Sequence, residues 1–375
     1  MRAFALEPEQ QRWCEELRSL AVDTFRPLAA DHGERACVNR PLVAALGDTG
    51  LLDRVFPAGG EPAKAVDLCL LRESLAHGCT EAETALALQG LGAYPLALAG
   101  TDEQRARLLP GIAAGRAVAA FALSEPGAGS DAAALSLRAV RTGDSWELHG
   151  TKTWISNAPH ADLYSVFART TEGAGARGVT AFLVPADRPG LTGEPLRMLS
   201  PHPIGTLTFD GVPVAADDML GEVDAGFALA MRTLNLFRPS VGAFAVGMAQ
   251  AALDAAVAHA GSRTAFGAPL RDMQAVSHQL AETATRIEAA RLLVYAAAAA
   301  YDRGEPGIAR RAAMAKLLAT ETAQQAVDTA VQIHGAAALQ HGHLLEHLYR
   351  EVRAPRIYEG ATEVQRSIIA KELYR

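Results

Sequence analysis

The sequence predicts an α+β protein with three successive regions: a helical N-terminal domain at residues 1–116, a mostly antiparallel β domain at 117–222 and a C-terminal helical bundle at 223–375. Ala-, Leu- and Glu-rich stretches dominate both ends of the chain. In the middle, short runs of β-branched and aromatic residues alternate with turn residues. With 375 residues, of which 49% are hydrophobic, the chain can bury a large core in two or three domains.

The two helical regions show apolar periodicity interrupted by Gly and Pro. In the N-terminal region the predicted helices cover residues 7–30, 63–77 and 81–99. In the C-terminal region they cover residues 227–260, 270–301, 307–333 and 363–373. Helices this long, joined by short loops, are typical of an antiparallel bundle.

The middle region has the spacing of strands and hairpins. A turn at residues 141–145 precedes Trp146, and further strands are predicted at 163–168, 179–184 and 206–209. We expect these strands to form a mostly antiparallel sheet.

Composition excludes several classes of function. The net charge is −7 and no Lys/Arg run stands out, so we expect no nucleic-acid partner. The charged N-terminus lacks the pattern of a secretory signal, and the uncharged apolar stretch at 292–301 is too short to cross a bilayer. We therefore expect a cytoplasmic protein without membrane insertion. The four cysteines form no CxxC pair and are expected to be reduced: Cys14, Cys37, Cys69 and Cys79.

Two apparent motifs do not support the functions they suggest. Residues 173–178 match G-x-G-x-x-G, but a predicted strand follows them where a dinucleotide site requires a helix. We interpret this segment as a hairpin connection. The C-terminal histidines lack the carboxylate or cysteine pattern of a metal site, and we interpret them as surface or helix-terminal residues: His334, His341, His343 and His347.

Three segments carry the chemistry. In residues 121–131 a strand enters a Ser-, Pro- and Gly-rich loop whose backbone N–H groups can approach a ligand closely. In residues 150–157 a Trp beside hydroxyl residues suits a planar aromatic cofactor, although a core Trp is the common alternative. In residues 356–365, Glu359 lies between a Tyr and a Gly before the last predicted helix; its other interpretation is a helix-start residue.

The order and spacing of these segments resemble the acyl-CoA dehydrogenase family over essentially the whole chain. The resemblance implies a helical N-terminal domain, a middle antiparallel β domain and a C-terminal four-helix bundle. It also implies FAD as the cofactor, an acyl-CoA substrate, an electron-transfer flavoprotein as acceptor and a homotetramer.

The resemblance assigns the flavin contacts residue by residue. Leu123, Ser124, Gly129 and Ser130 would meet the flavin and the pantetheine of the substrate. Trp154 and Ser156 would flank the flavin, with Ser156 near its N5 atom. A further group would hold the diphosphate and adenine across a subunit boundary: Arg263, Phe266, Gln274, Gln332 and Gly335.

On the substrate side, the resemblance implies that Asn235 and Arg238 contact CoA and that Ser130 and Gly360 also bind substrate. Glu359 would take the α proton while the β hydrogen leaves as hydride to the flavin. Some relatives carry the base one position before the matching arginine, where this chain has Phe237, which cannot serve. Glu359 is thus the base that the family pattern leaves.

The chain also departs from the family pattern. Ala361 stands where the family usually has a Thr, Ala336 where it has a second Gly and Ala265 where it commonly has a Gln or Thr. Asn235 and Glu351 each replace an Asp. Ser124 and Ser156 replace Thr but keep the hydroxyl group. Each loss removes about one hydrogen bond, of order 1 kcal/mol. Three alternatives stay open at this point: an oxidase, a dehydrogenase acting on an acyl-carrier-protein thioester, and a non-catalytic flavoprotein subunit.

Overall fold

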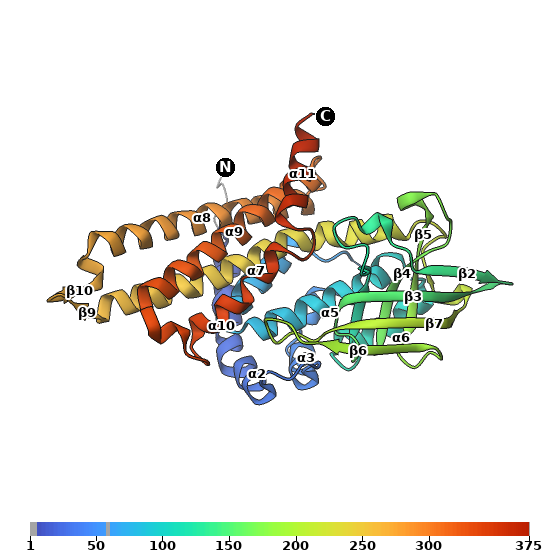
Figure 1. Cartoon of the computed structure of the whole chain (residues 1–375), viewed down its shortest axis with the longest axis horizontal. Coiled ribbons are helices and arrows are strands. Elements are labelled where there is room, and N and C mark those ends of the chain that lie inside the picture. Colours follow the sequence, from blue (N-terminus) through green and yellow to red (C-terminus); the bar gives the residue numbers. More distant parts are fainter. Residues whose placement is uncertain (1–5, 58–60, 375) are drawn as a thin grey trace. The chain divides into compact units, whose positions relative to one another are not determined.

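The computed structural model describes residues 6–57 and 61–374 (Figure 1). The helices of this part are α1 (Pro8–Leu20), α2 (Arg26–His32), α3 (Arg40–Asp48), α4 (Ala65–Gly78), α5 (Thr80–Ala99), α6 (Asp102–Ala113), α7 (Gly226–Ser262), α8 (Gln274–Asp302), α9 (Ile308–His334), α10 (Leu344–Glu351) and α11 (Thr362–Leu373). The strands are β1 (Ala119–Ala122), β2 (Arg138–Thr142), β3 (Ser145–Ser156), β4 (Leu163–Arg169), β5 (Val179–Pro185), β6 (Leu191–Leu196), β7 (Ile204–Val214), β8 (Met219–Leu220), β9 (Thr264–Ala265) and β10 (Ala268–Pro269).

The expected order of helical, β and helical regions is confirmed. The contacts of the chain group into two compact units. We call the first the bundle unit (Met1–Arg26, Lys64–Glu83 and Asn235–Arg375) and the second the sheet unit (Pro27–Ala63 and Thr84–Leu234). Both units draw on the N-terminal region, so they differ from the three sequence ranges, which stay a prediction of domain boundaries.

The sheet unit contains an eight-stranded sheet, within the described residues, in the order β6-β7-β3-β2-β4-β5-β8, with β1 also pairing with β4. Its pairs are antiparallel except β1–β4 and the single-residue β2–β4 pair. Strands β4 and β5 are buried almost throughout, which explains their continuous apolar sequences. The short stretch Gly175–Gly178 joins these two antiparallel strands, so the hairpin interpretation of the G-x-G-x-x-G match is confirmed.

The bundle unit is built on α8 and α9, which pack together, while α10 and α11 pack on α9 and α4 packs on both α1 and α8. Small residues allow the helices to approach closely. A Cβ added to Gly242 on α7 would lie 2.7 Å from Val294 on α8 and 3.4 Å from Ala319 on α9. The sequence did not predict α10 or β6. In β6, a Gly and a Pro obscure the strand pattern.

Helix α7 runs from the sheet unit into the bundle unit. By length and composition it is apolar enough to cross a membrane, with a mean hydropathy of 1.5 over an 18-residue window. This window is longer than the apolar stretch at residues 292–301 on which the sequence prediction was based. However, 72% of the window is buried inside the protein. Burial in a core accounts for its apolar composition.

Candidate active site

The turn at residues 357–361, directly before α11, carries Glu359. Its backbone is strained at Glu359, which has φ +51°, whereas Gly360 at φ +97° has a conformation that glycine adopts readily. A non-glycine residue at positive φ costs of order 1–3 kcal/mol and persists where its surroundings enforce it. Gln365 on α11 contributes to this enforcement, since its Nε2 donates to the carbonyl oxygens of Glu359 at 3.2 Å and Gly360 at 2.9 Å. A Cβ on Gly360 would lie 2.5 Å from that Nε2 atom.

Two buried cations also hold the turn through its carbonyl oxygens. Lys316 on α9, which is 0% exposed, donates to the carbonyl of Tyr358 at 2.7 Å and to that of Gly360 at 2.5 Å. Arg238 on α7 donates from Nε to the carbonyl of Glu359 at 3.1 Å. Burial lowers the pKa of Lys316 to about 8, although the nearby carboxylate of Glu359 opposes this effect. Charge-assisted bonds from two helices therefore fix the backbone on both sides of the carboxylate.

The outer ends of the turn are tied to α9 by one carboxylate. Glu321 accepts hydrogen bonds from Arg356 Nε at 3.0 Å and from Thr362 Oγ1 at 2.8 Å. A second contact joins Arg356 Nη2 and the other oxygen of Glu321 at 2.9 Å. The strained segment is thus anchored before and after Glu359, so its geometry is set by the bundle and not by the loop alone.

In contrast to the backbone of the turn, the carboxylate of Glu359 has one oxygen without a hydrogen bond within the described part of the chain. Its Oε2 atom is shielded from solvent and has no hydrogen-bond partner among the described residues. Burial raises the pKa of Glu359, while the charges of Arg72, Lys316 and Arg238 act in the opposite direction. Such a carboxylate combines a raised basicity with an oxygen that is not committed to a partner. This combination suits a general base.

The bundle unit also contains a buried ion pair. Arg72 on α4 and Glu83 on α5 are 2% and 1% exposed, and Nε of Arg72 donates to Oε1 of Glu83. Nη1 of Arg72 also donates to Oγ of Ser240 on α7 at 2.8 Å. The positive charge of Arg72 also opposes the rise in the pKa of Glu359 that burial causes.

The sequence predicted site roles for Glu359, Gly360 and Arg238 but gave none to Lys316 and Gln365, which bond to the turn, or to the buried pair Arg72 and Glu83. One signal was present, since Arg72 and Glu73 interrupt an otherwise apolar helical stretch at residues 68–76. A charge in such a stretch is a candidate for a buried, paired group. Lys316 gave a similar signal, because it interrupts the apolar stretch at residues 312–319.

In the sheet unit, the loop after β1 is fixed by a second buried ion pair. Glu125 accepts hydrogen bonds from Lys152 Nζ at 2.8 Å and from the backbone N–H groups of Ser136 at 2.6 Å and Leu137 at 2.9 Å. Lys152 also donates to the carbonyl of Leu123 at 2.8 Å. Burial lowers the pKa of Lys152 to about 8, against the opposing effect of Glu125. The predicted loop is therefore a preorganised element and not an ordinary surface turn.

The same loop lies beside the bulge in β3 that carries Trp154. The backbone N–H of Thr153 donates to the carbonyl of Ser124 at 3.0 Å. The β3–β7 register shifts between Lys152 and Ile155, and Trp154 there has φ +60° and is 56% exposed. A bulge redirects a side chain out of the regular alternation, which excludes the core-tryptophan alternative.

These residues fit a flavin. Trp154 offers an exposed aromatic face, and the partly exposed hydroxyl residues Ser124 and Ser156 belong to the adjoining loop and strand. A Cβ added to Gly129 would meet no atom within 4 Å, so the loop leaves open space beside it. An aromatic wall with nearby hydroxyl and backbone groups suits an isoalloxazine ring.

The second group of predicted cofactor residues lies at one end of the bundle unit. The β9–β10 hairpin follows α7 (Figure 1) and presents Phe266, which is 100% exposed at φ +52°. The rings of His259 on α7 and His334 on α9 stack with centroids 4.2 Å apart, which joins the two helix ends. Within this unit the stack brings two sets of exposed residues to the same end: Arg263, Phe266 and Gln274, and Gln332 and Gly335.

His334 and His343 lie at helix ends and His341 is exposed, as interpreted, but His347 lies within α10, where its Nε2 is 2.6 Å from Thr80 Oγ1. His334 ends α9, and His343 is the N-cap of α10 and accepts from the N–H of Leu345 at 3.1 Å. Burial lowers the pKa of His334. In the part of the chain that the structure describes, no group of three His, Cys, Asp or Glu side chains has the arrangement of a metal site.

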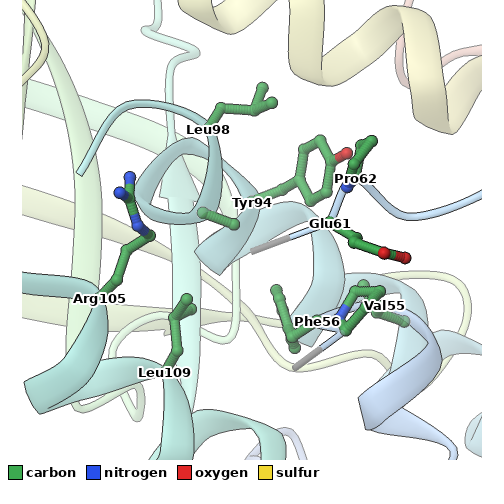
Figure 2. A pocket seen from close by; sticks show the side chains of 10 residues that line it. Val55, Phe56, Glu61, Pro62, Tyr94, Leu98, Arg105 and Leu109 are labelled. Carbon is green, nitrogen blue, oxygen red and sulfur yellow. The ribbon is translucent and has the colours of Figure 1, made fainter. Parts of the chain in front are cut away.

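A cavity of about 340 Å³ lies in the sheet unit, apart from these residues. Figure 2 shows Arg105 and Leu109 on one side of it and Glu61 and Pro62 on the other, with the ring of Tyr94 between them. None of the residues predicted from the sequence lines this cavity.

Comparison with known proteins identifies the class of this fold and site. The models of the acyl-CoA dehydrogenase N-terminal, middle and C-terminal domains match residues 7–116, 120–212 and 224–374. Cyclohexane-1-carbonyl-CoA dehydrogenase of Geobacter metallireducens is 37% identical over 367 residues, which cover 96% of each chain.

Two solved structures have the same fold over nearly the whole chain. Butyryl-CoA dehydrogenase from Megasphaera elsdenii has a TM-score of 0.93 and 32% identity, covering 99% of this chain and 100% of that chain. PigA with FAD and proline has a TM-score of 0.93 and 27% identity, covering 99% of both chains. The chain belongs to the acyl-CoA dehydrogenase family. It is an oxidoreductase of that family, and FAD is its cofactor.

Proposed function

We propose that the protein desaturates an acyl-CoA thioester between Cα and Cβ, with Glu359 as the base that takes the α proton. The observation that carries this proposal is the buried Oε2 atom of Glu359, which has no hydrogen-bond partner among the described residues although three cations act on its charge. An oxygen in this state can accept a proton without first breaking a bond to the protein.

The turn around Glu359 supports the same step. Lys316 and Arg238 bond to the carbonyl oxygens of the turn. Because C=O and N–H point in opposite directions in a trans peptide, the N–H groups of the turn point away from these two cations. We propose that the backbone N–H of Glu359 donates to the thioester oxygen as negative charge develops there. Removing one such donor typically costs roughly 3–4 kcal/mol of transition-state stabilisation.

In the sheet unit, the proposal assigns flavin binding to Leu123, Ser124, Gly129, Trp154 and Ser156. When bound, FAD supplies the acceptor for the β hydride. Trp154 would cover the ring and the hydroxyl groups would orient its polar edge. Ser130 would contact both cofactor and substrate.

The test is anaerobic reduction of the bound flavin by acyl-CoA in Glu359→Gln, with Glu363→Gln as the control. Gln keeps the shape of Glu but removes its basic carboxylate, so we expect normal FAD content and a rate reduced by ~10²–10⁴-fold. The control changes an exposed glutamate four residues further on and should keep the wild-type rate. Near-normal reduction by Glu359→Gln would show that the base lies elsewhere.

The substrate is proposed as an acyl-CoA, with Asn235 and Arg238 on the CoA side. Relatives named for cyclohexane-1-carbonyl-CoA and butyryl-CoA define the first probes. Bleaching of the flavin by these thioesters, compared with the matching acyl-carrier-protein thioesters, distinguishes the two carriers. Transfer of electrons to an electron-transfer flavoprotein, in preference to oxygen, would support a dehydrogenase over an oxidase.

The proposal includes a homotetramer acting in the cytoplasm in fatty acid metabolism. Its support is the exposed set at the end of the bundle unit, where Phe266 is 100% exposed and Arg263, three positions earlier, is also exposed. Arg263→Ala should lower FAD content and loosen the assembly. A monomer by light scattering that still holds one FAD per chain would contradict the shared site.

A further inference from the structure

The peptide unit that joins Tyr358 to Glu359 carries two groups with separate tasks. Its N–H group is the donor proposed above for the thioester oxygen. Its C=O group belongs to Tyr358 and accepts a hydrogen bond from the ammonium group of Lys316 at 2.7 Å. In a trans peptide the C=O and N–H groups point in opposite directions within one plane. The ammonium group therefore lies on one side of this peptide unit, and the oxygen that the N–H group would bind lies on the other.

The same turn shows that a carbonyl group can be held by a neutral donor. Gln365 is 0% exposed and donates to the carbonyls of Glu359 at 3.2 Å and Gly360 at 2.9 Å. Lys316 is also 0% exposed, and burying an ammonium group is far more costly than burying an amide. The positive charge of Lys316 therefore needs a reason beyond support of the backbone.

The charge acts on the peptide unit through the hydrogen bond. A bond from an ionised donor is roughly twice as strong as a neutral one. In an interior of low dielectric it polarises its acceptor and strengthens the next hydrogen bond in line by roughly 10–30%. Arg238 makes the equivalent bond one peptide further on, to the carbonyl of Glu359, so it polarises the N–H of Gly360. Lys316 is the cation placed to act on the N–H of Glu359.

We propose that the ammonium group of Lys316 polarises the peptide unit between Tyr358 and Glu359, which makes the N–H of Glu359 a stronger donor to the thioester oxygen. The gain is largest in the transition state, because an oxygen that carries negative charge is a better acceptor than the neutral carbonyl. Lys316 is thus a positioning residue that acts on the substrate through the peptide without touching it. This inference rests on the proposed role of the Glu359 N–H group.

The experiment follows the C=O stretching band of a bound thioester whose carbonyl carbon is carbon-13. The ligand is the α,β-unsaturated product of butyryl-CoA or cyclohexane-1-carbonyl-CoA, whichever thioester reduces the wild-type flavin faster. A hydrogen bond to this oxygen lowers the frequency of the band, and a stronger bond lowers it further. Isotope-edited infrared spectra are recorded on the FAD-loaded Glu359→Gln variant, because Gln keeps the backbone N–H group and removes the carboxylate that titrates.

Raising the pH removes the charge of Lys316 and leaves the length of its side chain unchanged. In the wild type, burial lowers the pKa of Lys316 to about 8; Arg238 on α7 adds to this effect, while Glu359 in the turn and Glu321 on α9 oppose it. Loss of the Glu359 charge places the pKa lower still, and buried lysines titrate down to about pH 5–6, so the scan runs from about pH 5 to 10. Over this range the lowering of the band relative to the free ligand should shrink by roughly 10–30%.

The double variant Glu359→Gln with Lys316→Met separates this effect from other titrations. Its band should already lie at higher frequency at the acid end of the scan and should not move as the pH rises. With Glu359 intact, Lys316→Met should slow anaerobic flavin reduction by about two- to eightfold through this effect alone. That range follows because 10–30% of a donor worth ~10²–10³ in kcat is lost.

Thr320→Val is the matched control on the same helix. Thr320 is 1% exposed, and both hydrogen bonds of its Oγ1 stay within α9, at 2.9 Å to the carbonyl of Lys316 and at 3.4 Å to that of Leu317. Whatever its effect on the unfolding temperature, this variant should leave the band, its pH dependence and the rate unchanged.

The inference is overturned if the band has the same position with and without Lys316, or if it moves equally with pH in both proteins. It is also overturned if Lys316→Met reduces flavin at the wild-type rate. A band that is not lowered at all in Glu359→Gln would contradict the proposed N–H donor and remove this inference with it. Near-normal flavin reduction by Glu359→Gln would contradict only the proposed base, because the band reports the N–H group at that position and not its carboxylate.

Discussion

Lys316 Nζ lies 2.7 Å from the carbonyl oxygen of Tyr358, so a fully buried ammonium group of α9 supports the turn that carries Glu359. Among the described residues, no carboxylate makes a direct, short contact with this buried charge. Instead, the ammonium group donates to backbone carbonyls and feels Glu359 only electrostatically. The hydrogen bonds that offset the desolvation of this cation therefore also fix the backbone beside the proposed base.

The depressed pKa of Lys316 predicts a pH-dependent stability. Burial lowers this pKa from 10.5 to about 8 in the folded protein. Between these values the unfolded chain holds a proton that the folded chain has released, so the contribution of Lys316 to stability rises with pH. The stability of the wild type relative to Lys316→Met should therefore rise between pH 8 and 10, by up to ~1.4 kcal/mol per unit.

Urea unfolding of both proteins at pH 7, 8, 9 and 10 measures this difference. Lys371→Met, at an exposed position of α11, controls for the general loss of one positive charge. A difference between wild type and Lys316→Met that stays constant or shrinks with rising pH would mean that the ammonium group is not penalised by burial.

Gly360→Ala should disable the turn. The new Cβ would lie 2.5 Å from Gln365 Nε2, and φ is +97°, which L-residues rarely adopt. Displacing Gln365 releases the carbonyl of Glu359 and moves the carboxylate. Because a shift of about 1 Å can cost ~10²-fold in rate, we expect a loss of that order per bound flavin.

Gly304→Ala is the matched control for that variant. Gly304 lies between α8 and α9 at φ +65°, and an added Cβ there would meet no atom within 4 Å. Both variants carry backbone strain, but only Gly360→Ala should slow flavin reduction in a stopped-flow measurement. Equal effects of the two would indicate general destabilisation.

The sequence predicted the parts of the site that lie in continuous segments. Glu359, Gly360 and the loop around Ser124 belong to short motifs, and their neighbours in sequence are also neighbours in space. The supports could not be predicted, because Lys316 and Arg238 reach the turn from helices 43 and 121 residues away in the chain. Helical periodicity identifies a buried face but not which turn of a partner helix it meets.

The grouping of the N-terminal helices was hidden for a similar reason. Helix α4 belongs to the bundle unit and most of α5 to the sheet unit, although only a single residue separates them. The role predicted for Arg238 at CoA stays a prediction, and the structure adds its bond to the Glu359 carbonyl. No local pattern in the sequence distinguishes these two tasks of one arginine.

Trp154→Ala should weaken FAD binding and leave the fold intact. The side chain is 56% exposed on the bulge of β3, so its removal creates no core cavity. Aromatic stacking contributes about 1 kcal/mol beyond buried area, which corresponds to about fivefold in affinity. Titration of the apoprotein by flavin fluorescence measures it. Trp154→Phe keeps an aromatic face and should retain most of the affinity, and equal losses in both variants would argue against stacking.

Glu125→Gln tests whether the loop after β1 is preorganised by its buried ion pair. Gln keeps the shape of Glu, but its NH₂ group would face donors where the carboxylate now accepts from Ser136, Leu137 and Lys152. Removing one partner of a buried pair typically costs roughly 3–5 kcal/mol. Without the Glu125 carboxylate, which raises the pKa of Lys152 in the wild type, Lys152 releases its proton at lower pH and so reduces that cost. We therefore expect a lower unfolding temperature and reduced FAD content, with the difference from the wild type narrowing as the pH rises toward 8. The exposed Glu194→Gln on β6 should change neither quantity. Normal FAD content in Glu125→Gln would mean that the loop keeps its flavin-binding geometry without the ion pair.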